Sequence, residues 1–148
     1  MSARVLANVT GVVIGGRALL IEGPPGAGKS SLALALIDRG AMLVGDDAVS
    51  VERRGDAVLA SPPPNTEGLL ELRNVGIAEF PVASGPVALV LALDRAAPRF
   101  PVELATRDIA GSAIPLLPFA AGDAVQALRA EHALALHGLP LPKPDENA

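Results

Sequence analysis

The sequence predicts a single α/β domain with an aliphatic core. Three observations support this: half of the 148 residues are apolar, only 2% are aromatic, and short apolar runs alternate with turn residues. A chain of this length can bury one core and is too short for two. Because there are three Phe and no Trp or Tyr, the core must consist of Leu, Val, Ile and Ala, which suits packed layers of helix and sheet.

The first 40 residues predict a strand hairpin, a glycine-rich stretch and a helix. Three short apolar runs come first, at residues 4–8, 11–14 and 17–21. Gly15-Gly16 marks a tight turn between the second and the third run, so the third enters the glycine-rich stretch as a strand. Residues 31–39 are strong helix formers, and Gly40 is typical of the position just past a helix end.

The middle of the chain predicts short strands. Residues 49–80 are interrupted by turn residues and predict a meander, because they are too broken for long helices. Residues 87–93 form a continuous apolar run that is typical of a buried strand. Edge strands are predicted at residues 102–104 and 106–109.

The C-terminal part predicts one more helix. It covers residues 123–136, with Asp123 as its N-cap and Gly138 just past its end. The last residues are rich in proline and polar side chains, which favours a frayed end. We therefore expect one domain over residues 1–139 and a disordered tail over 140–148.

Composition excludes several classes of function. A net charge of −4 and a pI near 5.1 give no basic surface for nucleic acid. The absence of cysteine excludes disulfides and thiolate metal sites. The N-terminal residues are too few and too mixed for a signal peptide, and every apolar run is too short to cross a membrane. We expect a cytoplasmic protein with no nucleic-acid or membrane partner.

The glycine-rich stretch matches the phosphate-loop motif G-x-x-x-x-G-K-[ST] at every fixed position. It consists of Gly23, Pro24, Pro25, Gly26, Ala27, Gly28, Lys29 and Ser30. In such a P-loop, backbone amides surround the phosphates, Lys29 reaches the β- and γ-phosphates, and the Ser30 hydroxyl ligates Mg²⁺. The alternative is a Gly/Pro turn that only joins a strand to a helix. The flanking strand and helix favour binding of ATP with Mg²⁺.

Two aspartates follow the next apolar run. Residues 42–44 are apolar, and Asp46 and Asp47 come just after them. A magnesium nucleotide site needs a carboxylate at such a strand end, and the second aspartate can then face an acceptor hydroxyl. The alternative is that both residues only form a turn.

Glu71 and Arg73 are spaced to share one face of an extended strand. A carboxylate and a guanidinium on one face could hold a metal ion and a phosphate. An exposed pair of opposite charges across two strands explains the same spacing. The histidines, His132 and His137, have no placed partner for a metal site or a nucleophile and are interpreted as surface residues.

In this order, the motifs and the pair Pro62-Pro63 resemble the catalytic domain of HPr kinase/phosphorylase. The resemblance covers about residues 4–94 and matches a short form that lacks the family's N-terminal domain. It implies a P-loop-containing mixed sheet, similar to phosphoenolpyruvate carboxykinase around the phosphate loop, with a helix after that loop. It also implies a homo-oligomer, since full-length members of the family form hexamers.

The resemblance further implies an ATP-dependent kinase that phosphorylates a serine of the phosphocarrier HPr, with phosphorolysis as the reverse activity of many members. Mg²⁺ is then held by Ser30 and Glu71, with Asp46 close by. Asp47 takes the proton of the acceptor serine, and Lys29 and Arg73 steady the transferred phosphoryl group.

The chain also departs from the family pattern. Asn8 stands where a histidine is common, and Ala48 stands where a polar or basic residue is usual. Ser31 replaces an acidic residue, and Asn74 replaces a glycine. Residues 83–86 lack an arginine that is expected there. These changes argue against phosphorolysis and predict reduced kinase activity, whereas nucleotide binding should survive. A nucleotide-binding regulatory protein of the same fold is therefore an alternative to the kinase. A small-molecule kinase is a third hypothesis, although the sequence contains no convincing lid with an arginine.

Overall fold

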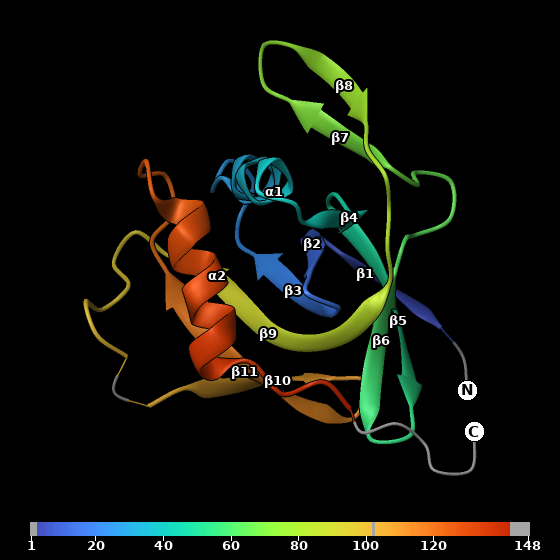
Figure 1. The fold of residues 1–148 in the computed structure, drawn as a ribbon, viewed down its shortest axis with the longest axis vertical. Coiled ribbons are helices and arrows are strands. Elements are labelled where there is room, and N and C mark those ends of the chain that lie inside the picture. The colour runs from blue at the N-terminus through green and yellow to red at the C-terminus, as the bar shows by residue number, and fades with distance from the viewer. Residues whose placement is uncertain (1–2, 102, 143–148) are drawn as a thin grey trace.

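The computed structural model describes residues 3–101 and 103–142, which form a curled mixed sheet with two helices against it (Figure 1). The first half of the chain contributes β1 (Arg4–Ala7), β2 (Val9–Ile14), β3 (Arg17–Glu22), α1 (Lys29–Asp38), β4 (Met42–Gly45), β5 (Ala48–Arg54), β6 (Ala57–Ser61) and β7 (Leu69–Leu72). The second half contributes β8 (Gly76–Glu79), β9 (Gly85–Leu93), β10 (Ala105–Ile109), β11 (Ser112–Phe119) and α2 (Gln126–His137).

Several strands run in one direction and end at the same edge of the sheet. β9 pairs in parallel with β3 on one side and with β11 on the other. β2 is antiparallel to both β3 and β4, so β4 runs the same way as β3. The carboxyl ends of β3, β4, β9 and β11 therefore lie at one edge, outside which open α/β sheets bind their ligands.

The long strand β9 connects the two parts of the curled sheet. Its first residues pair with β6, and β5 and β1 continue the sheet beyond β6. Figure 1 shows β9 as a strongly curved strand that runs below α1 and reaches α2 at its left-hand end. The hairpin of β7 and β8 forms a separate two-stranded sheet that stands out from the body of the protein.

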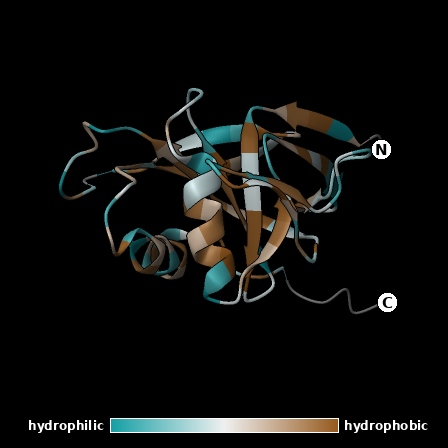
Figure 2. Cartoon of the chain, turned by 90° about the horizontal axis from the view of Figure 1, so that it is seen from above, coloured by the Kyte–Doolittle hydropathy of each residue, from teal (hydrophilic) through white to brown (hydrophobic). Residues whose placement is uncertain are grey.

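Two apolar clusters lie on the two sides of the sheet. One is between the sheet and the helices and includes Leu32 of α1 and Leu134 of α2. The other lies inside the curl and includes Val51 of β5. β9 contributes Leu89 to the first cluster and Val90 to the second, because successive side chains of a strand point to opposite faces. The strands through the middle of Figure 2 are accordingly mostly hydrophobic.

The start of α2 differs from the sequence prediction. The helix begins at Gln126, with Val125 as its N-cap, and not at Asp123. The Asp123 carboxylate instead accepts a hydrogen bond from the Val125 amide at 3.1 Å, and it also pairs with Arg129. An aspartate that bonds the amide two residues on forms a turn, and this turn precedes the helix. Gly138 follows the end of α2, as predicted.

The region before α2 contains a strand that the sequence pattern did not predict. β11 carries Pro115 and Pro118, which interrupt the usual strand signal. It pairs with β10, and β10 confirms the edge strand predicted at residues 106–109. The strand predicted at 102–104 is not found at residues 103 and 104, which are not part of a strand. Position 102 lies outside the described residues.

The end of the described chain stays attached to the sheet. The Leu139 amide donates a hydrogen bond to the carbonyl oxygen of Ala88 at 2.9 Å. The tail predicted at 140–148 lies outside the described residues from position 143 onward. Neither described helix has the length and apolar character needed to cross a membrane.

Gly45, at the end of β4, is required by the tight corner that leads into β5. A Cβ at this position would lie 2.1 Å from the Ala48 carbonyl oxygen and 2.9 Å from Cδ of Pro63. We expect Gly45→Ala to lower the free energy of unfolding by roughly 2–3 kcal/mol, measured by urea denaturation. Gly55→Ala is the control, since its Cβ would meet nothing within 4 Å and only its positive φ costs about 1 kcal/mol. If both variants lowered the free energy of unfolding by the same amount, this explanation would be contradicted.

Candidate active site

The loop between β3 and α1 has a backbone that requires glycine at two positions. Gly26 and Gly28 have φ values of 80° and 103°, in the left-handed region. A Cβ at either position would meet nothing within 4 Å, so backbone conformation and not crowding explains the two glycines. The Ala27 amide donates to the Pro24 carbonyl oxygen at 3.1 Å and closes the turn of the loop.

α1 starts directly from this loop and leaves amide groups unpaired at its first turn. Its first hydrogen bond runs from the Leu32 amide to the carbonyl oxygen of the N-cap, Gly28, at 3.0 Å. No side chain in the described part of the protein caps this end. The amides of Lys29, Ser30 and Ser31 therefore have no partner within the helix. Together with the positive end of the helix dipole, they favour a bound anion.

Lys29 is a buried cation beside this anion site. The residue is only 8% exposed, and Nζ donates to the carbonyl oxygens of Gly23 at 2.7 Å and Pro24 at 3.3 Å. Within residues 3–101 and 103–142 it forms no ion pair with a carboxylate. An ammonium group has three N–H donors, and a buried charge is costly without a counter-charge. Both facts fit an anion at the mouth of the loop.

Asp46 connects the start of α1 with the projecting hairpin. Its Oδ1 accepts a hydrogen bond from Ser30 Oγ at 2.7 Å, and its Oδ2 accepts one from the Glu71 amide at 3.4 Å. Oδ1 also accepts from Thr10 Oγ1 at 3.0 Å. Because the Ser30 proton is directed at Asp46, the lone pairs of the Ser30 oxygen remain available to a cation.

Asp47 has an unusual backbone that is held from two sides. Its φ is 62°, a left-handed value that only a few per cent of residues other than glycine adopt. Its amide donates to Thr10 Oγ1 at 3.2 Å, and its carbonyl oxygen accepts from the Asn8 amide at 2.8 Å. The carboxylate of Asp47 is exposed at the site, where an acceptor group can reach it.

A single pocket of about 370 Å³ brings most of the predicted site residues together. It is lined by Asn8, Pro25, Gly26, Gly28, Lys29, Ser30, Ser31, Asp46, Asp47, Glu71 and Arg73. Gly23, Pro24 and Ala27 do not line it, although the first two supply the carbonyl oxygens that bind Lys29. The pocket thus combines backbone amides, one buried ammonium, a guanidinium and three carboxylates.

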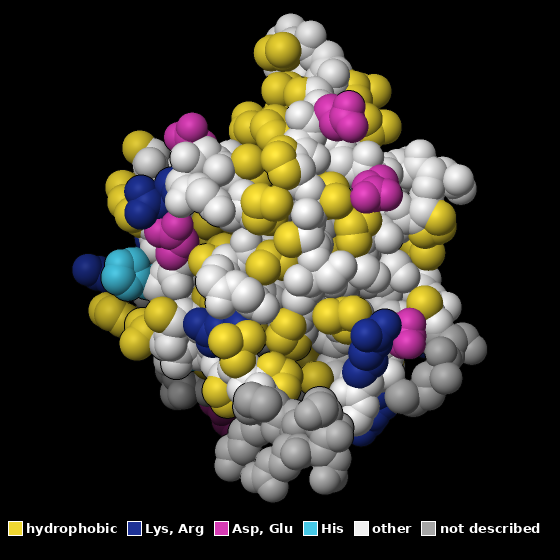
Figure 3. Space-filling view, turned by 45° about the vertical axis from the view of Figure 1, so that its right-hand side comes forward, with side chains coloured by type: hydrophobic (Ala, Val, Ile, Leu, Met, Phe, Trp, Pro, Cys, Tyr) yellow, Lys and Arg dark blue, Asp and Glu magenta, His cyan; other side chains and the backbone are white. Residues whose placement is uncertain are grey.

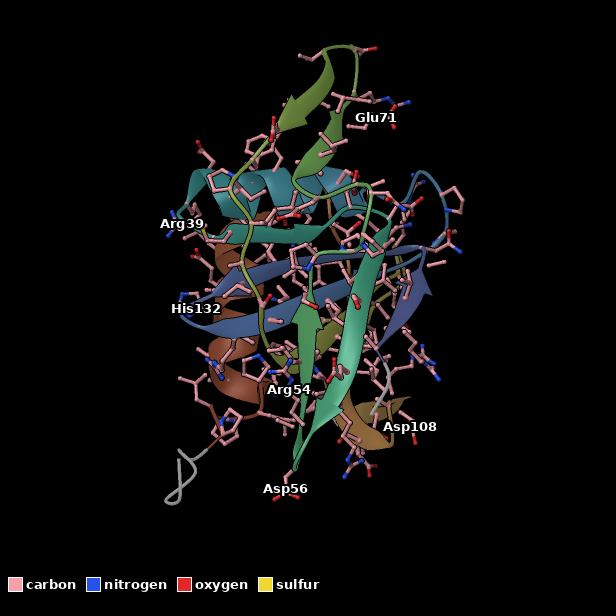
Figure 4. The ribbon with its side chains drawn as sticks, turned by 90° about the vertical axis from the view of Figure 1, so that its right-hand side faces the viewer. Arg39, Arg54, Asp56, Glu71, Asp108 and His132 are labelled. Carbon is pink, nitrogen blue, oxygen red and sulfur yellow. The ribbon has the colours of Figure 1, made fainter. Side chains whose placement is uncertain are left out.

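The hairpin of β7 and β8 carries Glu71 and Arg73 to the pocket in a different way from the prediction. Glu71 lies on β7, as Figure 4 shows, but β7 ends at Leu72 and Arg73 falls in the turn that follows. The two residues therefore do not share a strand face, because the chain turns through the Val75 amide, which donates to the Leu72 carbonyl oxygen at 3.0 Å. They still meet at the same pocket.

The outer part of this hairpin is apolar. Hydrophobic side chains gather over it at the top of Figure 3, where Leu69, Val75 and Ile77 are exposed. Leu70 points the other way and is fully buried. One buried leucine and the hydrogen bond from the Glu71 amide thus anchor the hairpin beside the pocket.

The donor set of the pocket suits a magnesium ion that also binds a phosphate. In the described part of the chain, no three His, Asp or Glu side chains gather as a ready metal cluster. Magnesium usually takes one or two carboxylates and completes its shell with water and substrate phosphate oxygens. Ser30, Glu71 and Asp46 would hold it in this way, because Ser30 and Asp46 are already bonded to each other and Glu71 lines the same pocket.

Glu22, just before the loop, is engaged elsewhere. The Arg107 guanidinium donates to both of its carboxylate oxygens, from Nη2 to Oε1 and from Nε to Oε2 at 3.2 Å. This hydrogen bonding and the charge of Glu22 raise the pKa of Arg107 above its ordinary value. Glu22 is therefore not free to join the metal site from the β3 side.

Comparison with known proteins identifies the family. Residues 2–90 match the model of the HPr Serine kinase C-terminal domain. The chain belongs to this family. The resemblance seen in the motifs is thereby confirmed, and the match includes the phosphate loop, both aspartates and the hairpin with Glu71 and Arg73.

Curated and solved members of the HPr kinase family show how far the similarity extends. The chain is 43% identical over 74 residues to the HPr kinase/phosphorylase of Clostridium acetobutylicum, covering 50% of this chain and 24% of that protein. It is 38% identical over 109 residues to the HPr kinase/phosphorylase of Burkholderia cenocepacia, covering 65% of this chain and 34% of that protein. The chain thus spans about a quarter to a third of these relatives.

The solved structure of the Hpr(Ser) kinase/phosphatase from Coxiella burnetii resembles this chain with a TM-score of 0.74. The two are 25% identical, and the superposition covers 90% of this chain and 92% of the other. The structural likeness therefore extends past the family match into β10, β11 and α2. The predicted mixed α/β fold of the HPr kinase type is confirmed.

Three residues at which the chain departs from the family pattern lie at or near the pocket. Asn8 and Ser31 line it, and Asn74 occupies the hairpin turn with φ 65°. Ala48 is the first residue of β5. Asn8 lies next to Asp47, since its backbone N–H donates to the Asp47 carbonyl oxygen and both residues line the pocket.

Thr10 is the site residue that the sequence analysis missed. The apolar runs predicted at residues 4–8 and 11–14 leave Thr10 between them, whereas β2 extends without interruption from Val9 to Ile14. Two signals were available in the sequence. The β-branched side chain of threonine favours a strand, and a polar residue within an apolar strand is unusual. Its two contacts with the aspartates could not be read from spacing.

Proposed function

We propose that this chain is an ATP- and Mg²⁺-dependent protein serine kinase of the HPr kinase/phosphorylase type. It transfers the γ-phosphoryl group of ATP to a serine of HPr or a related phosphocarrier protein. The observation that carries the proposal is the single pocket that Lys29, Ser30, Asp47, Glu71 and Arg73 line together. The names of the relatives, HPr kinase/phosphorylase, support the reaction class.

The loop and the start of α1 bind the phosphates of the donor. Their unpaired amides donate hydrogen bonds to the negatively charged phosphate oxygens, and the third N–H of Lys29 is free to bond another phosphate oxygen. Mg²⁺, held by Ser30, Glu71 and Asp46, would supply positive charge that neutralises the phosphate oxygens. Arg73, which also lines the pocket, steadies the phosphoryl group that is transferred.

Asp47 acts as the base. It accepts the proton of the acceptor serine hydroxyl while that oxygen forms a bond to the γ-phosphorus and the bond from phosphorus to ADP breaks. Its carboxylate is exposed, and a base that acts on a protein substrate must be accessible in this way. We expect little phosphorolysis, because Asn8 provides an amide where an imidazole could hold a charge or move a proton.

The proposal is tested by incubating the protein with an HPr-type phosphocarrier, ATP and Mg²⁺, and by measuring the intact mass of the acceptor. We expect one phosphoryl group, mapped to a serine by fragmentation, and none when Mg²⁺ is chelated. Transfer that needs neither ATP nor Mg²⁺, or transfer to a histidine, would contradict the proposal. We also expect a cytoplasmic homo-oligomer, which light scattering of the same sample would measure.

A regulatory protein that binds nucleotide without efficient transfer is the second candidate. Asn8 favours it, because it lines the pocket with the proposed base and its side-chain amide cannot act as a base or carry a charge as a histidine could. Tight Mg²⁺-dependent ATP binding without any transfer would support this candidate. A screen of metabolite acceptors would reveal the small-molecule kinase, the remaining alternative.

A further inference from the structure

Thr10 is a fully buried polar residue in an otherwise apolar part of β2. The residue is 0% exposed, and it lies between Val9 and Gly11 on β2, a strand that has β3 on one side and β4 on the other. A buried hydroxyl is costly unless it is hydrogen-bonded. Here it makes two hydrogen bonds, as donor to Asp46 Oδ1 at 3.0 Å and as acceptor from the Asp47 amide at 3.2 Å.

The strand around Thr10 is held on both sides. β2 pairs with β3 along its whole length and with β4 through Gly11, which lies opposite Gly45. Asp46 and Asp47 come directly after Gly45, where β4 has ended and the chain turns toward β5. The Thr10 hydroxyl therefore comes from a strand that is paired with β3, whereas the two aspartates lie at a corner outside the strands. Other groups also bond this corner, namely Ser30 Oγ and the Glu71 amide on Asp46 and the Asn8 amide on Asp47.

The two hydrogen bonds of Thr10 act on different parts of the site. On Asp46, Oδ1 accepts from both Thr10 and Ser30, which fixes the plane of the carboxylate toward α1. On Asp47, the bond fixes the amide of a residue in the left-handed region, while the Asn8 amide fixes its carbonyl oxygen. A conformation of this kind persists only where the surroundings hold it.

We propose that Thr10 is a positioning residue, whose hydroxyl aims the Asp46 carboxylate at the metal side of the pocket and the Asp47 carboxylate at the acceptor side. The inference rests on the proposed kinase function for its consequence in catalysis. The clamp, by which we mean the hydrogen bonds of the Thr10 hydroxyl to Asp46 Oδ1 and to the Asp47 amide, is present in the protein without nucleotide. Thr10 acts through the two aspartates and lies outside the residues that line the pocket.

The clamp is tested by hydrogen exchange of the Asp47 amide in the ligand-free protein. Thr10→Val keeps the shape of the side chain and removes the hydroxyl, so we expect exchange at this amide to be about tenfold faster, the size of effect that one lost hydrogen bond produces. Thr10→Ser keeps the hydroxyl and should restore slow exchange. Ser50→Ala removes another buried hydroxyl, one that makes no described contact with either aspartate, and should leave the Asp47 amide unchanged.

The catalytic consequence is tested with the same variants. With ATP held at saturation, we expect Thr10→Val to lower kcat about tenfold or more and to raise the Mg²⁺ concentration needed for half-maximal rate, while the affinity for ATP in the absence of Mg²⁺ is unchanged. Thr10→Ser should restore most of the wild-type kcat and most of the wild-type Mg²⁺ dependence. If Thr10→Val does not fold, Thr10→Ala removes the same hydroxyl without placing a methyl group against the Asp47 amide.

The outcomes separate this inference from the proposed function. An Asp47 amide that exchanges equally fast in the wild type and in Thr10→Val would overturn the inference, whatever the enzyme does. Changed exchange with an unchanged kcat and unchanged Mg²⁺ dependence would also overturn it, because the clamp would then have no role in the reaction. A wild type without transfer activity would refute the kinase proposal, and the exchange experiment would still decide whether Thr10 holds the aspartates.

Discussion

Replacing Asp47 with asparagine is expected to slow phosphoryl transfer about 10²- to 10⁴-fold, the range that a positioned general base contributes. Asparagine has nearly the same shape and tolerates the left-handed backbone that φ 62° imposes. The hydrogen bonds through the amide and the carbonyl oxygen of residue 47 should therefore persist. Only the ability to accept the serine proton is lost.

The Asp47→Asn effect is measured as kcat for transfer to an HPr-type protein, alongside the dissociation constant of ATP with Mg²⁺. The matched control is Asp56→Asn, an exposed aspartate in the turn between β5 and β6, which should change neither quantity. A variant that keeps full transfer activity would exclude Asp47 as the base. A variant that loses ATP affinity to the same degree as kcat would instead place Asp47 in nucleotide binding.

Replacing Lys29 with methionine is expected to weaken the binding of ATP roughly 100-fold, because hydrogen bonds to charged groups contribute about 1.5–3 kcal/mol. Methionine has a similar length, so the walls of the loop stay filled. The stability of the folded protein should be unchanged or higher, since the wild type buries an ammonium that bonds only neutral carbonyl oxygens in the described structure. Opposite effects on binding and stability are typical of a residue placed for a ligand.

Displacement of a fluorescent nucleotide measures the Lys29→Met effect on binding, and thermal unfolding without nucleotide measures stability. Arg39→Met is the control, because Arg39 forms an exposed ion pair with Glu131 near the opposite end of α1. Its loss should leave nucleotide affinity unaltered. Unchanged affinity in Lys29→Met would contradict the role assigned to the loop.

The parts of the fold that the sequence predicted best depend on local signals. The Gly15-Gly16 turn, the helix after the phosphate loop and the buried strand at residues 87–93 all appear at or near the predicted positions. Each follows from backbone conformation or apolar periodicity within a few residues. The start of α2 was misplaced because an aspartate can cap a helix or form a turn, and its neighbours decide which.

The parts that the sequence could not predict depend on contacts between distant residues. β11 carries two prolines and is a strand because β9 and β10 pair with it from both sides. Similarly, spacing placed Glu71 and Arg73 on one strand, whereas a turn after Leu72 brings them to the pocket.

The residue types of the candidate site were predictable, but their connections were not. The motif identified Lys29 and Ser30, and the strand end identified the two aspartates. That Asp46 accepts hydrogen bonds from Thr10, Ser30 and Glu71 follows only from the packing of β2, α1 and β7 around it. A network that joins residues 10, 30, 46 and 71 leaves no periodic trace in the sequence.

Calorimetric titration of the wild-type protein with ATP, in the presence of Mg²⁺ and then with the metal chelated, examines the phosphate site without any assumption about the acceptor. We predict one nucleotide per chain and an affinity that falls at least tenfold when Mg²⁺ is removed, because in the proposed site the side-chain oxygens of Ser30, Asp46 and Glu71 would reach the phosphates through the cation. Heat changes no larger than those of dilution, with or without Mg²⁺, would contradict a nucleotide site at residues 23–30.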